Sequence, residues 1–421
     1  MVTVTHPNQP PELSQSTTAL SSPGIDNRSL NVLQIVPSIS LVYGGPSQMV
    51  RGFSQALSQQ GANVTILTTD SNGDNGQAPL DVPLNQPVDQ DGYTVRYFHC
   101  APFRRYKFSL DLLKWLYQHA HEFDIAHIHA LFSPVSSGAA AIARYRRLPY
   151  ILRPLGTLDP ADLQKKRQLK QIYATLLEKP NIAGAAGLHF TSPQENQVSE
   201  RFGTQTPGFV IPLGVTPFSP VPQNPNSKIQ NSTPTILFMS RIDPKKGLDL
   251  LIPALENLLD NGQTFRFVMA GSNPQDPAYE AEVRDRIHAS PLGACTTITG
   301  FVQGEAKQAL LREADIFVLP SYYENFGIAV AEAMAANLPV VISDQVHIHN
   351  DIQQAQAGWV CACDVGSLMM GLLEALQNPD QRRQRGENAR RCAEVNYSWD
   401  AIAQKTITAY RTILGFQTPV R

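Results

Sequence analysis

Short apolar runs of strand length alternate with amphipathic helical segments along almost the whole chain. This alternation restricts the possible folds more than any other feature. Residues 31–38 and 63–70 are two such runs, and Met49 and Phe53 lie on one helical stripe between them. The runs are continuously apolar, whereas a strand with one solvated face would alternate. We therefore expect strands buried on both faces, in a parallel sheet that is covered by helices.

The same pattern occurs twice, on either side of a stretch that contains five prolines at residues 216–235. Such a stretch is typical of a domain linker. We predict an α/β protein with two Rossmann-like domains that face each other across a cleft, with ligands at the carboxyl ends of the strands. The predicted parts are a disordered tail (1–29), an N-terminal acceptor domain (30–215), the linker (216–235), a C-terminal donor domain (236–397) and a final helix that packs back on the N-terminal domain (398–421).

Charge and cysteine content exclude several classes of protein. Lys and Arg total 34 against 36 Asp and Glu, a balance that does not favour nucleic-acid binding through bulk charge. The five cysteines are too few for a disulfide framework and suit a reducing compartment. The sequence has no apolar run of about 18 residues and no basic segment followed by an apolar one at its start. We expect a cytoplasmic enzyme with no nucleic-acid partner.

Two glutamates with seven residues between them give the strongest local signal. Glu324 follows an apolar run in a loop, and Glu332 lies in the helix that begins near Gly327. The backbone N–H groups of Asn325, Phe326 and Gly327 are expected to be free at the start of that helix, where they suit an anionic or hydroxyl-rich ligand. The spacing alone also fits two solvated glutamates after an ordinary strand and turn.

Two cations follow the first strand of the second half. Arg241 comes directly after the run 235–240, and Lys246 lies just before the next helix. A forked guanidinium and a point-charge ammonium at a cleft edge suit a diphosphate. A solvated surface turn around Pro244 is the alternative.

These motifs together resemble those of the retaining glycosyltransferases of the GT-B fold, most of all the group known as family 4 and its bacterial extracellular-polysaccharide members. The resemblance rests on Arg241 and Lys246 after a strand, Gly271, the segment Gly-Phe-Val at 300–302, and Glu324 with Glu332. The segment from Val36 to Thr69 resembles the opening strand, glycine loop and helix of that family. The resemblance covers about residues 31–415.

The resemblance implies a role for each matching residue. Its donor is a nucleoside diphosphate sugar, with UDP or GDP expected, and no metal or other cofactor is implied. The acceptor is a glycan or lipid-linked saccharide. The implied roles are Arg241 and Lys246 on the diphosphate, Glu332 on the ribose, Glu324 and the N–H groups of Asn325, Phe326 and Gly327 on the transferred sugar, Gly271 in the donor site, and Gly44 and Gly45 beside the phosphates and acceptor.

The family also carries a histidine at the end of a strand in its first domain. His129 matches that position and is the implied catalytic partner of Glu324, and alternation places His127 on the same strand face. A metal site on His127 and His129 is one alternative, although the sequence supplies no third ligand nearby, and a neutral core histidine is another. Asp89 and Asp91 match the metal motif of another glycosyltransferase fold, but Gly92 predicts a tight turn there.

Other interpretations stay open. A nucleotide-sugar epimerase of the same fold or a non-catalytic nucleotide-sugar sensor would share the donor site, whereas a dehydrogenase would need a fuller glycine motif than Gly44-Gly45-Pro46. Residues 344–360 lack the glycine-rich turn and glutamate of the family, which leaves the sugar specificity open. Basic residues of the first half suggest peripheral contact with the inner membrane face, and scattered solvated charge is the alternative: Arg104, Arg105, Lys107, Arg144, Arg146, Arg147, Lys165, Lys166, Arg167 and Lys170.

Overall fold

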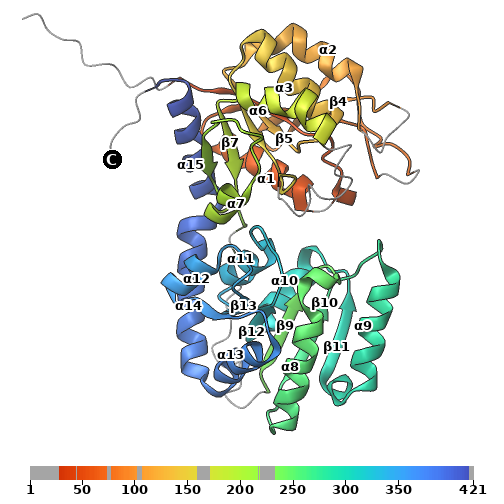
Figure 1. The fold of residues 1–421 in the computed structure, drawn as a ribbon, viewed down its shortest axis with the longest axis vertical. Coiled ribbons are helices and arrows are strands. Elements are labelled where there is room, and N and C mark those ends of the chain that lie inside the picture. Colours follow the sequence, from red (N-terminus) through yellow and green to blue (C-terminus); the bar gives the residue numbers. More distant parts are fainter. Residues whose placement is uncertain are drawn as a thin grey trace, which may run out of the picture.

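Two parallel sheets, one in each half of the chain, form the framework of the protein (Figure 1). The structure is a computed structural model that describes residues 28–43, 45–73, 77–101, 107–158, 171–216, 218 and 233–416. The predicted disordered tail, apart from Arg28 and Ser29, and most of the predicted linker lie outside these ranges. The expectation of parallel α/β units that bury their strands is confirmed for the described residues.

The first sheet has eight strands in the order β3-β4-β2-β1-β5-β6-β7-β8. All its neighbours are parallel except β3 and β4, which form an antiparallel hairpin at the edge. Asp91 and Gly92 have positive φ angles of 42° and 91° in the turn of that hairpin, which confirms the predicted tight turn. The strands are β1 (Asn31–Ile35), β2 (Asn63–Thr69), β3 (Pro87–Gln90), β4 (Tyr93–Phe98), β5 (Ile125–His129), β6 (Tyr150–Arg153), β7 (Gly187–Phe190) and β8 (Gly208–Val210).

Helices on both faces of this sheet bury it in two apolar layers. Val32 and Ile66 face the layer that holds α1, whereas Leu33 and Leu67 face the layer that holds α2 and α3. Alternate residues of one strand therefore enter different cores, which explains the continuous apolar runs. The helical segments are η1 (Leu41–Tyr43), α1 (Gly45–Gln59), α2 (Leu110–His119), η3 (Ala120–Glu122), α3 (Pro134–Arg146), the π-helix η4 (Ala174–Glu178), α6 (Lys179–Gly184) and α7 (Pro193–Val198).

The second sheet has six parallel strands in the order β11-β10-β9-β12-β13-β14 around a separate core. The strands are β9 (Thr235–Met239), β10 (Arg266–Ala270), β11 (Thr296–Gly300), β12 (Ile316–Leu319), β13 (Val340–Ser343) and β14 (Gly358–Cys361). The helical segments are η5 (Pro244–Lys246), α8 (Leu248–Asp260), α9 (Pro277–Ala289), η6 (Pro291–Cys295), α10 (Gly304–Glu313), α11 (Ile328–Ala335), α12 (His349–Ala355), α13 (Val365–Gln377), α14 (Pro379–Tyr397) and α15 (Trp399–Ile413).

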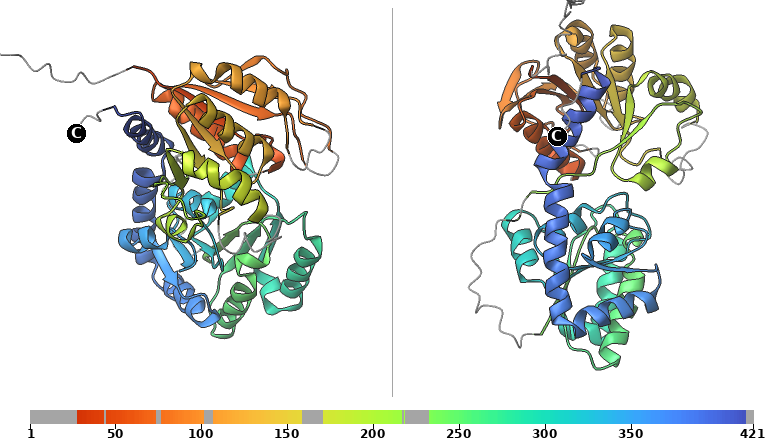
Figure 2. Two further views of the ribbon diagram at one scale, coloured as in Figure 1. Left: turned by 45° about the horizontal axis from the view of Figure 1, so that its top comes forward. Right: turned by 90° about the vertical axis from the view of Figure 1, so that its left-hand side faces the viewer.

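The last two helices run along both halves of the molecule. Figure 2 shows α14 beside the second half and α15 beside the first, as one nearly continuous column. Trp399, at the start of α15, fits against two glycines: a Cβ atom on Gly52 or Gly214 would lie 2.5 Å or 2.2 Å from its indole ring. The close approach of α15 to α1 therefore depends on Gly52, and its close approach to the segment after β8 depends on Gly214.

Candidate active site

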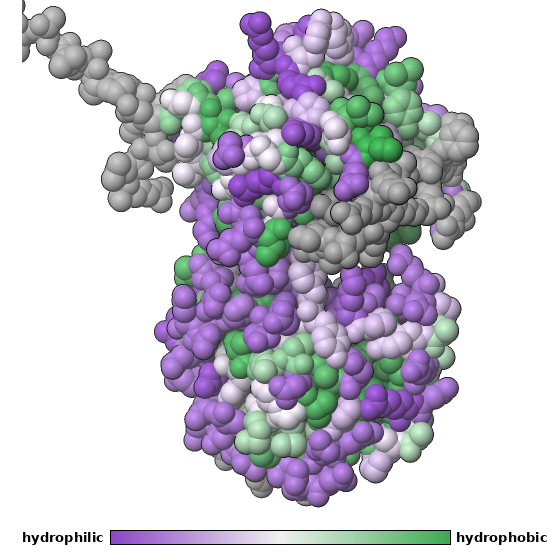
Figure 3. All heavy atoms as spheres, in the orientation of Figure 1, coloured by the Kyte–Doolittle hydropathy of each residue, from purple (hydrophilic) through white to green (hydrophobic). Residues whose placement is uncertain are grey.

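The carboxyl ends of the two sheets meet at the junction between the halves. Figure 3 shows the molecule narrowing there. Ser192, just after β7, has its Oγ 3.4 Å from Nδ1 of His347, which follows β13. Thr191 approaches the carbonyl oxygen of Asn325, which follows β12, at 3.5 Å, and a Cβ on Gly156 would lie 2.7 Å from Nδ2 of that asparagine. Loops at the strand ends, where open α/β sheets bind ligands, therefore form this junction.

The loop from β12 to α11 is held against the loop that follows β13. The N–H of Glu324 donates to the carbonyl of Gln345 at 3.2 Å, and the N–H of His347 donates to the carbonyl of Glu324 at 3.0 Å. Gly327 then has a φ of 79° and begins α11, a left-handed conformation that favours glycine. These contacts fix the position of Glu324 at the carboxyl edge of the second sheet.

Lys246 and Glu324 form an ion pair across this edge. Nζ of Lys246 donates to Oε2 of Glu324, and their side chains are 15% and 23% exposed. The family resemblance implies that Lys246 binds the diphosphate and that Glu324 contacts the sugar, which are two neighbouring parts of one ligand. Their direct contact shows that both side chains reach the same place.

A second ion pair involves a residue that the sequence analysis did not identify. Nζ of Lys307, on α10, donates to Oε1 of Glu332 at 2.7 Å, and both side chains are about a quarter exposed. Lys307 lies in the first turn of α10, the helix that follows β11. A cation at this place after a strand could have been recognised from the sequence as a candidate site residue. Glu332 thus has a cationic neighbour.

Three backbone N–H groups lie between these pairs. Among the described residues, the N–H groups of Asn325, Phe326 and Gly327 have no hydrogen-bond partner. The side chain of Phe326 is buried against Tyr397, with ring centroids 5.2 Å apart, and the side chain of Asn325 accepts from Tyr323 at 2.6 Å. The side chains are therefore fixed while the N–H groups remain available as donors at a helix N-terminus.

Arg241 and Gly271 lie at the carboxyl ends of β9 and β10. The Arg241 side chain is 51% exposed and contacts Asp243 at 3.1 Å, so it is free to move toward a ligand. Gly271 has a φ of 145°, and a Cβ there would lie 1.8 Å from the carbonyl oxygen of Ser240. This close approach gives Gly271 a structural reason to be glycine, and its role in donor binding stays a prediction.

The glycine loop of the first half is only partly described. Gly44 lies outside the described residues. Gly45 is the first residue of α1, and a Cβ built on it would meet no atom of the described protein within 4 Å. Packing therefore gives no reason for glycine at position 45, and its role beside the phosphates and acceptor stays a prediction.

His129 ends β5 and is fully buried. It stacks on His127 with ring centroids 4.7 Å apart, which confirms that both histidines share a strand face. A third histidine, His189 on β7, also lies here, with its Nδ1 3.1 Å from Nε2 of His127. Within the described ranges, no group of three His, Cys, Asp or Glu side chains is arranged to hold a metal ion.

Burial controls the charge of these histidines. It lowers the pKa of His127 to about 3, with the charge of Arg153 as the second cause. Burial also lowers the pKa of His129 and of His189 well below the usual range, and Arg153 and the neighbouring histidines add to the effect. All three imidazoles are therefore neutral at pH 7. Arg153 itself is 2% exposed, so it lies in the core rather than in an open cleft.

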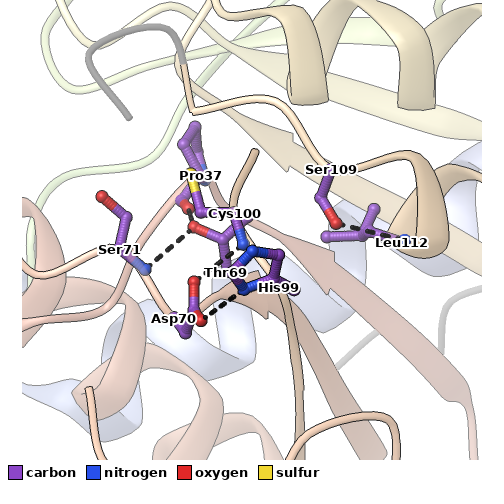
Figure 4. A network of polar contacts seen from close by, with 8 residues as sticks. All are labelled: Pro37, Thr69, Asp70, Ser71, His99, Cys100, Ser109 and Leu112. Carbon is purple, nitrogen blue, oxygen red and sulfur yellow. Dashed lines mark hydrogen bonds and ion pairs between the residues drawn. The ribbon is translucent and has the colours of Figure 1, made fainter. Parts of the chain in front are cut away.

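Polar groups also gather at the carboxyl ends of β2 and β4 (Figure 4). The carboxylate of Asp70 accepts from the N–H of Cys100 at 2.7 Å and contacts Nδ1 of His99 at 3.1 Å. Next to it, the Thr69 hydroxyl donates to the carbonyl of Pro37 at 2.6 Å and accepts from the N–H of Ser71. This network joins the carboxyl ends of β2 and β4 to the segment that follows β1.

The family-divergent segment after β13 has structural roles in this protein. Val346 and His347 are buried, and His347 reaches the first half through Ser192. Asp351 accepts a hydrogen bond of 2.6 Å from Tyr397, at the end of α14. The segment therefore helps to join the two halves.

Among the basic residues considered for membrane contact, Arg144, Arg146 and Arg147 are exposed at the end of α3, whereas Arg104, Arg105 and the group from Lys165 to Lys170 lie outside the described residues. No helix in the described ranges combines the length and apolar character required to cross a bilayer.

Two family models match the two halves of the chain. The model for "Glycosyl transferase 4-like domain" matches residues 44–214, and that for "Glycosyl transferases group 1" matches residues 222–392. The chain carries both domains of a GT-B glycosyltransferase. An uncharacterized glycosyltransferase of Methanocaldococcus jannaschii is 32% identical over 189 residues, which are 44% of this chain and 46% of that protein. The chain thus spans about half the length of the first curated relatives that it matches.

Solved structures share the GT-B architecture over almost the whole chain. A sucrose-phosphate synthase of Thermosynechococcus elongatus has a TM-score of 0.70 at 19% identity and covers 93% of this chain and 100% of its own. The Anabaena protein HepE in complex with UDP has a TM-score of 0.70 at 17% identity and covers 91% of this chain and 100% of its own. At these identities the similarity shows the fold, which confirms the predicted GT-B class.

Proposed function

We propose that this GT-B protein transfers a sugar from a nucleoside diphosphate sugar to a hydroxyl group of a glycan or lipid-linked acceptor. The observation that carries the proposal is the arrangement around α11. Two lysine–glutamate pairs lie beside the first half of this helix, and three N–H groups that no described residue binds lie at its N-terminus, at the junction of the two sheets. Cations and N–H donors suit the diphosphate, and carboxylates suit hydroxyl groups of ribose and sugar.

In this proposal, the ligand exchanges the ion pairs for its own contacts. The donor diphosphate takes Lys246 from Glu324, and Arg241 turns from Asp243 toward the same phosphates. Glu324 is then free to accept hydrogen bonds from sugar hydroxyls, and Glu332 from those of the ribose. The ion pairs neutralise the charges of the lysines, of Arg241 and of the two glutamates, so that no isolated charge stands at a partly buried site.

The proposed chemistry retains the configuration of the sugar. The bond between the anomeric carbon and the phosphate oxygen breaks, and the acceptor oxygen forms a bond from the same face. The acceptor proton leaves with the departing phosphate. Lys246, Arg241 and the N–H groups before α11 stabilise the growing charge on that phosphate without a divalent cation. Glu324 then acts by positioning the sugar and stabilising charge.

UDP is the first donor nucleotide to test, because the Anabaena structures with the same fold contain UDP or UDP-glucose. The family resemblance supports GDP as the alternative. We further propose a role in bacterial surface or extracellular polysaccharide synthesis in the cytoplasm, with peripheral membrane contact through the basic surface near α3. Exposed arginines beside Tyr145, which is 71% exposed, support this contact.

Thermal-shift measurements test the donor site. The full chain is melted with UDP, GDP, ADP and their sugar conjugates, with and without EDTA. A rise in Tm with one nucleotide that EDTA leaves unchanged supports the proposal, since a ligand that binds only the native state stabilises it. No shift with any nucleotide contradicts it, and a shift abolished by EDTA contradicts metal independence. Release of nucleotide without any added acceptor would instead favour the epimerase.

A further inference from the structure

A cavity of about 420 Å³ lies between α13 and β14, the edge strand of the second sheet. It is lined by residues 359–361 of β14 and by one side of α13 with the residue that follows it, from Ser367 to Asn378. Its volume falls within the range of about 300–1,000 Å³ that is usual for small-molecule sites. None of its lining residues belongs to the candidate active site, so a molecule bound in it would occupy a second place on the protein.

The indole N–H of Trp359 is a buried donor without an acceptor. Trp359 is 7% exposed, and its Nε1 atom is buried with no hydrogen-bond partner in the described part of the chain. The guanidinium of Arg385 lies 4.6 Å from the centroid of the indole ring and also donates to the carbonyl of Gly358 at 2.6 Å, so the ring is held in place. A buried donor that lacks an acceptor destabilises the native state, and a bound molecule that accepts from it removes this penalty.

The backbone of Val360 offers a second donor and an acceptor at the edge of the sheet. In the parallel ladder of β13 and β14, the N–H of Asp344 donates to the carbonyl of Cys361 at 2.9 Å, so alternate residues of β14, Trp359 and Cys361, direct their backbone groups toward β13. The N–H and C=O of Val360 therefore point away from β13. No described residue forms a hydrogen bond with either group.

Side chains cap the edge on both sides of Val360. The carbonyl of Gly358 accepts from Arg385, and the N–H of Ala362 donates to Oγ of Ser367 at 2.9 Å. The free edge is thus one residue long, which is too short to pair with an added β-strand. Its N–H and C=O suit a small molecule that carries an acceptor beside a donor. An amino-substituted heteroaromatic ring holds such a pair at a fixed spacing, so little ligand entropy is lost on binding.

The walls and the charge of the cavity restrict the ligand further. Met370, which is 57% exposed, and Leu373 line it, so a ligand that covers them removes apolar surface from water. Glu374 is the one charged residue among the lining residues, and burial raises the pKa of the Cys361 thiol to about 11, which keeps it protonated. An anionic ligand would therefore meet a negative charge, with no cation among the lining residues.

We propose that this cavity binds an uncharged, amino-substituted heteroaromatic molecule of the aminopyrimidine type. A ring nitrogen accepts from the N–H of Val360, the amino group donates to the carbonyl of Val360, and a second acceptor meets the indole N–H of Trp359. Met370 and Leu373 contact the apolar part of the ring. The proposal does not rest on sugar transfer, because the cavity shares no residue with the candidate active site.

Binding can be located in the wild-type protein. The probe is 2-aminopyrimidine, whose two ring nitrogens are acceptors and whose amino group is a donor. The full chain is labelled with 5-fluorotryptophan, and the 19F signals of Trp115, Trp359 and Trp399 are assigned by replacing each with Phe. The probe should shift the Trp359 signal saturably, with a Kd in roughly the millimolar range for so small a molecule, and leave the other two signals in place. A Trp359 signal that stays unchanged at about 50 mM probe overturns the proposal.

A second probe and a nucleotide test the assigned contacts. 2-(Dimethylamino)pyrimidine keeps the ring acceptors but has no N–H to donate to Val360, so its Kd should be about fivefold higher. UDP should leave the titration with 2-aminopyrimidine unchanged, because the candidate donor site is elsewhere. Equal Kd values for the two probes, or displacement of 2-aminopyrimidine by UDP, contradict the proposal.

Substitution tests the indole N–H. Trp359→Phe keeps an aromatic ring but removes the donor, and ligand-detected NMR should give a Kd for 2-aminopyrimidine that is about fivefold higher. Trp115→Phe is the matched control, since Trp115 also has a guanidinium over its ring, that of Arg96 at 4.9 Å, but lies in the first half. The control should keep the wild-type Kd. Equal Kd values in the two variants overturn the role of Trp359.

Val360→Pro provides a second route if Trp359→Phe fails to fold. It removes the N–H of Val360 at an outward position of an edge strand, where proline is tolerated, and it keeps the indole of Trp359 as a reporter. The saturable shift of the Trp359 19F signal should then require about tenfold more probe. A wild-type titration in this variant overturns the proposal.

Discussion

Lys246 and Glu324 contact each other although 78 residues separate them in the chain. Lys246 follows β9 and Glu324 follows β12, and these two strands are neighbours in the second sheet. The parallel pairing brings both strand ends to one edge. A residue proposed for the diphosphate and a residue proposed for the sugar therefore occupy one site.

Glu324→Ala and Lys246→Ala should each abolish transfer without unfolding the protein. Both remove a group that we propose to contact the donor, and we expect kcat/KM to fall by at least about 100-fold. Each also leaves a partly exposed partner unpaired, at a cost of roughly 1 kcal/mol of stability. Transfer assays and thermal melting measure the two effects. Glu394→Ala breaks the exposed pair of Glu394 with Arg390 on α14 and serves as the control. Loss of cooperative melting in either site variant would show that the pair is mainly structural.

Glu332→Gln should weaken nucleotide binding more than it slows the chemical step. The substitution turns the charged acceptor that we propose for the ribose hydroxyls into a neutral amide, which corresponds to a rise in Kd of about tenfold or more. Isothermal titration with the nucleotide found by thermal shift measures it. Lys307→Met is the matched control, since it breaks the same ion pair but keeps the carboxylate. If both variants bind the nucleotide equally well, Glu332 does not hold the ribose.

Acidification should destabilise the protein through the buried histidines. The folded pKa of His127 is about 3 against about 6.5 when unfolded, and burial lowers the folded pKa of His129 and His189 in the same direction. Between these values the unfolded chain binds more protons, so the free energy of unfolding falls as pH drops below about 6.5. The slope is about 1.4 kcal/mol per pH unit for each histidine.

Urea denaturation at pH 7.5, 6 and 5 measures this effect of the histidines. His189→Gln should reduce the slope, whereas His288→Gln, which alters an exposed histidine of α9, should leave it unchanged. A free energy of unfolding that stays constant from pH 7.5 to 5 would mean that these histidines are accessible to protons in the native state.

Gly271→Ala should destabilise the second half severely. The new Cβ would lie 1.8 Å from the carbonyl oxygen of Ser240, which belongs to the backbone at the end of the adjacent strand and cannot turn away as a flexible side chain can. We expect a loss of about 3 kcal/mol or more. Gly300→Ala is the control, because Gly300 also has a positive φ of 70° but no atom of the described protein within 4 Å of a Cβ, and it should lose only about 1 kcal/mol. Equal losses in urea denaturation would indicate that the contact with Ser240 relaxes easily.

The sequence by itself determined the two parallel α/β units. Their strands appear as continuous apolar runs, because each strand is buried on both faces, and the residues that follow strand ends were recognisable as site candidates. Arg241, Lys246, Glu324 and Glu332 do lie at the carboxyl edge of the second sheet. The local sequence pattern was enough to predict these strands, helices and strand ends, because helix and strand periodicity depends on residues that are close in the sequence.

Only the tertiary structure decided which candidates meet. The pairing of Lys307 with Glu332 depends on the strand order β11-β10-β9-β12, which no local pattern states. The environment of His129 depends on Tyr410. This residue of α15 packs against β5, although the whole second half of the chain lies between the two elements in the sequence. Such contacts depend on how separate elements dock. The side chains that bury a histidine can therefore lie hundreds of residues away from it.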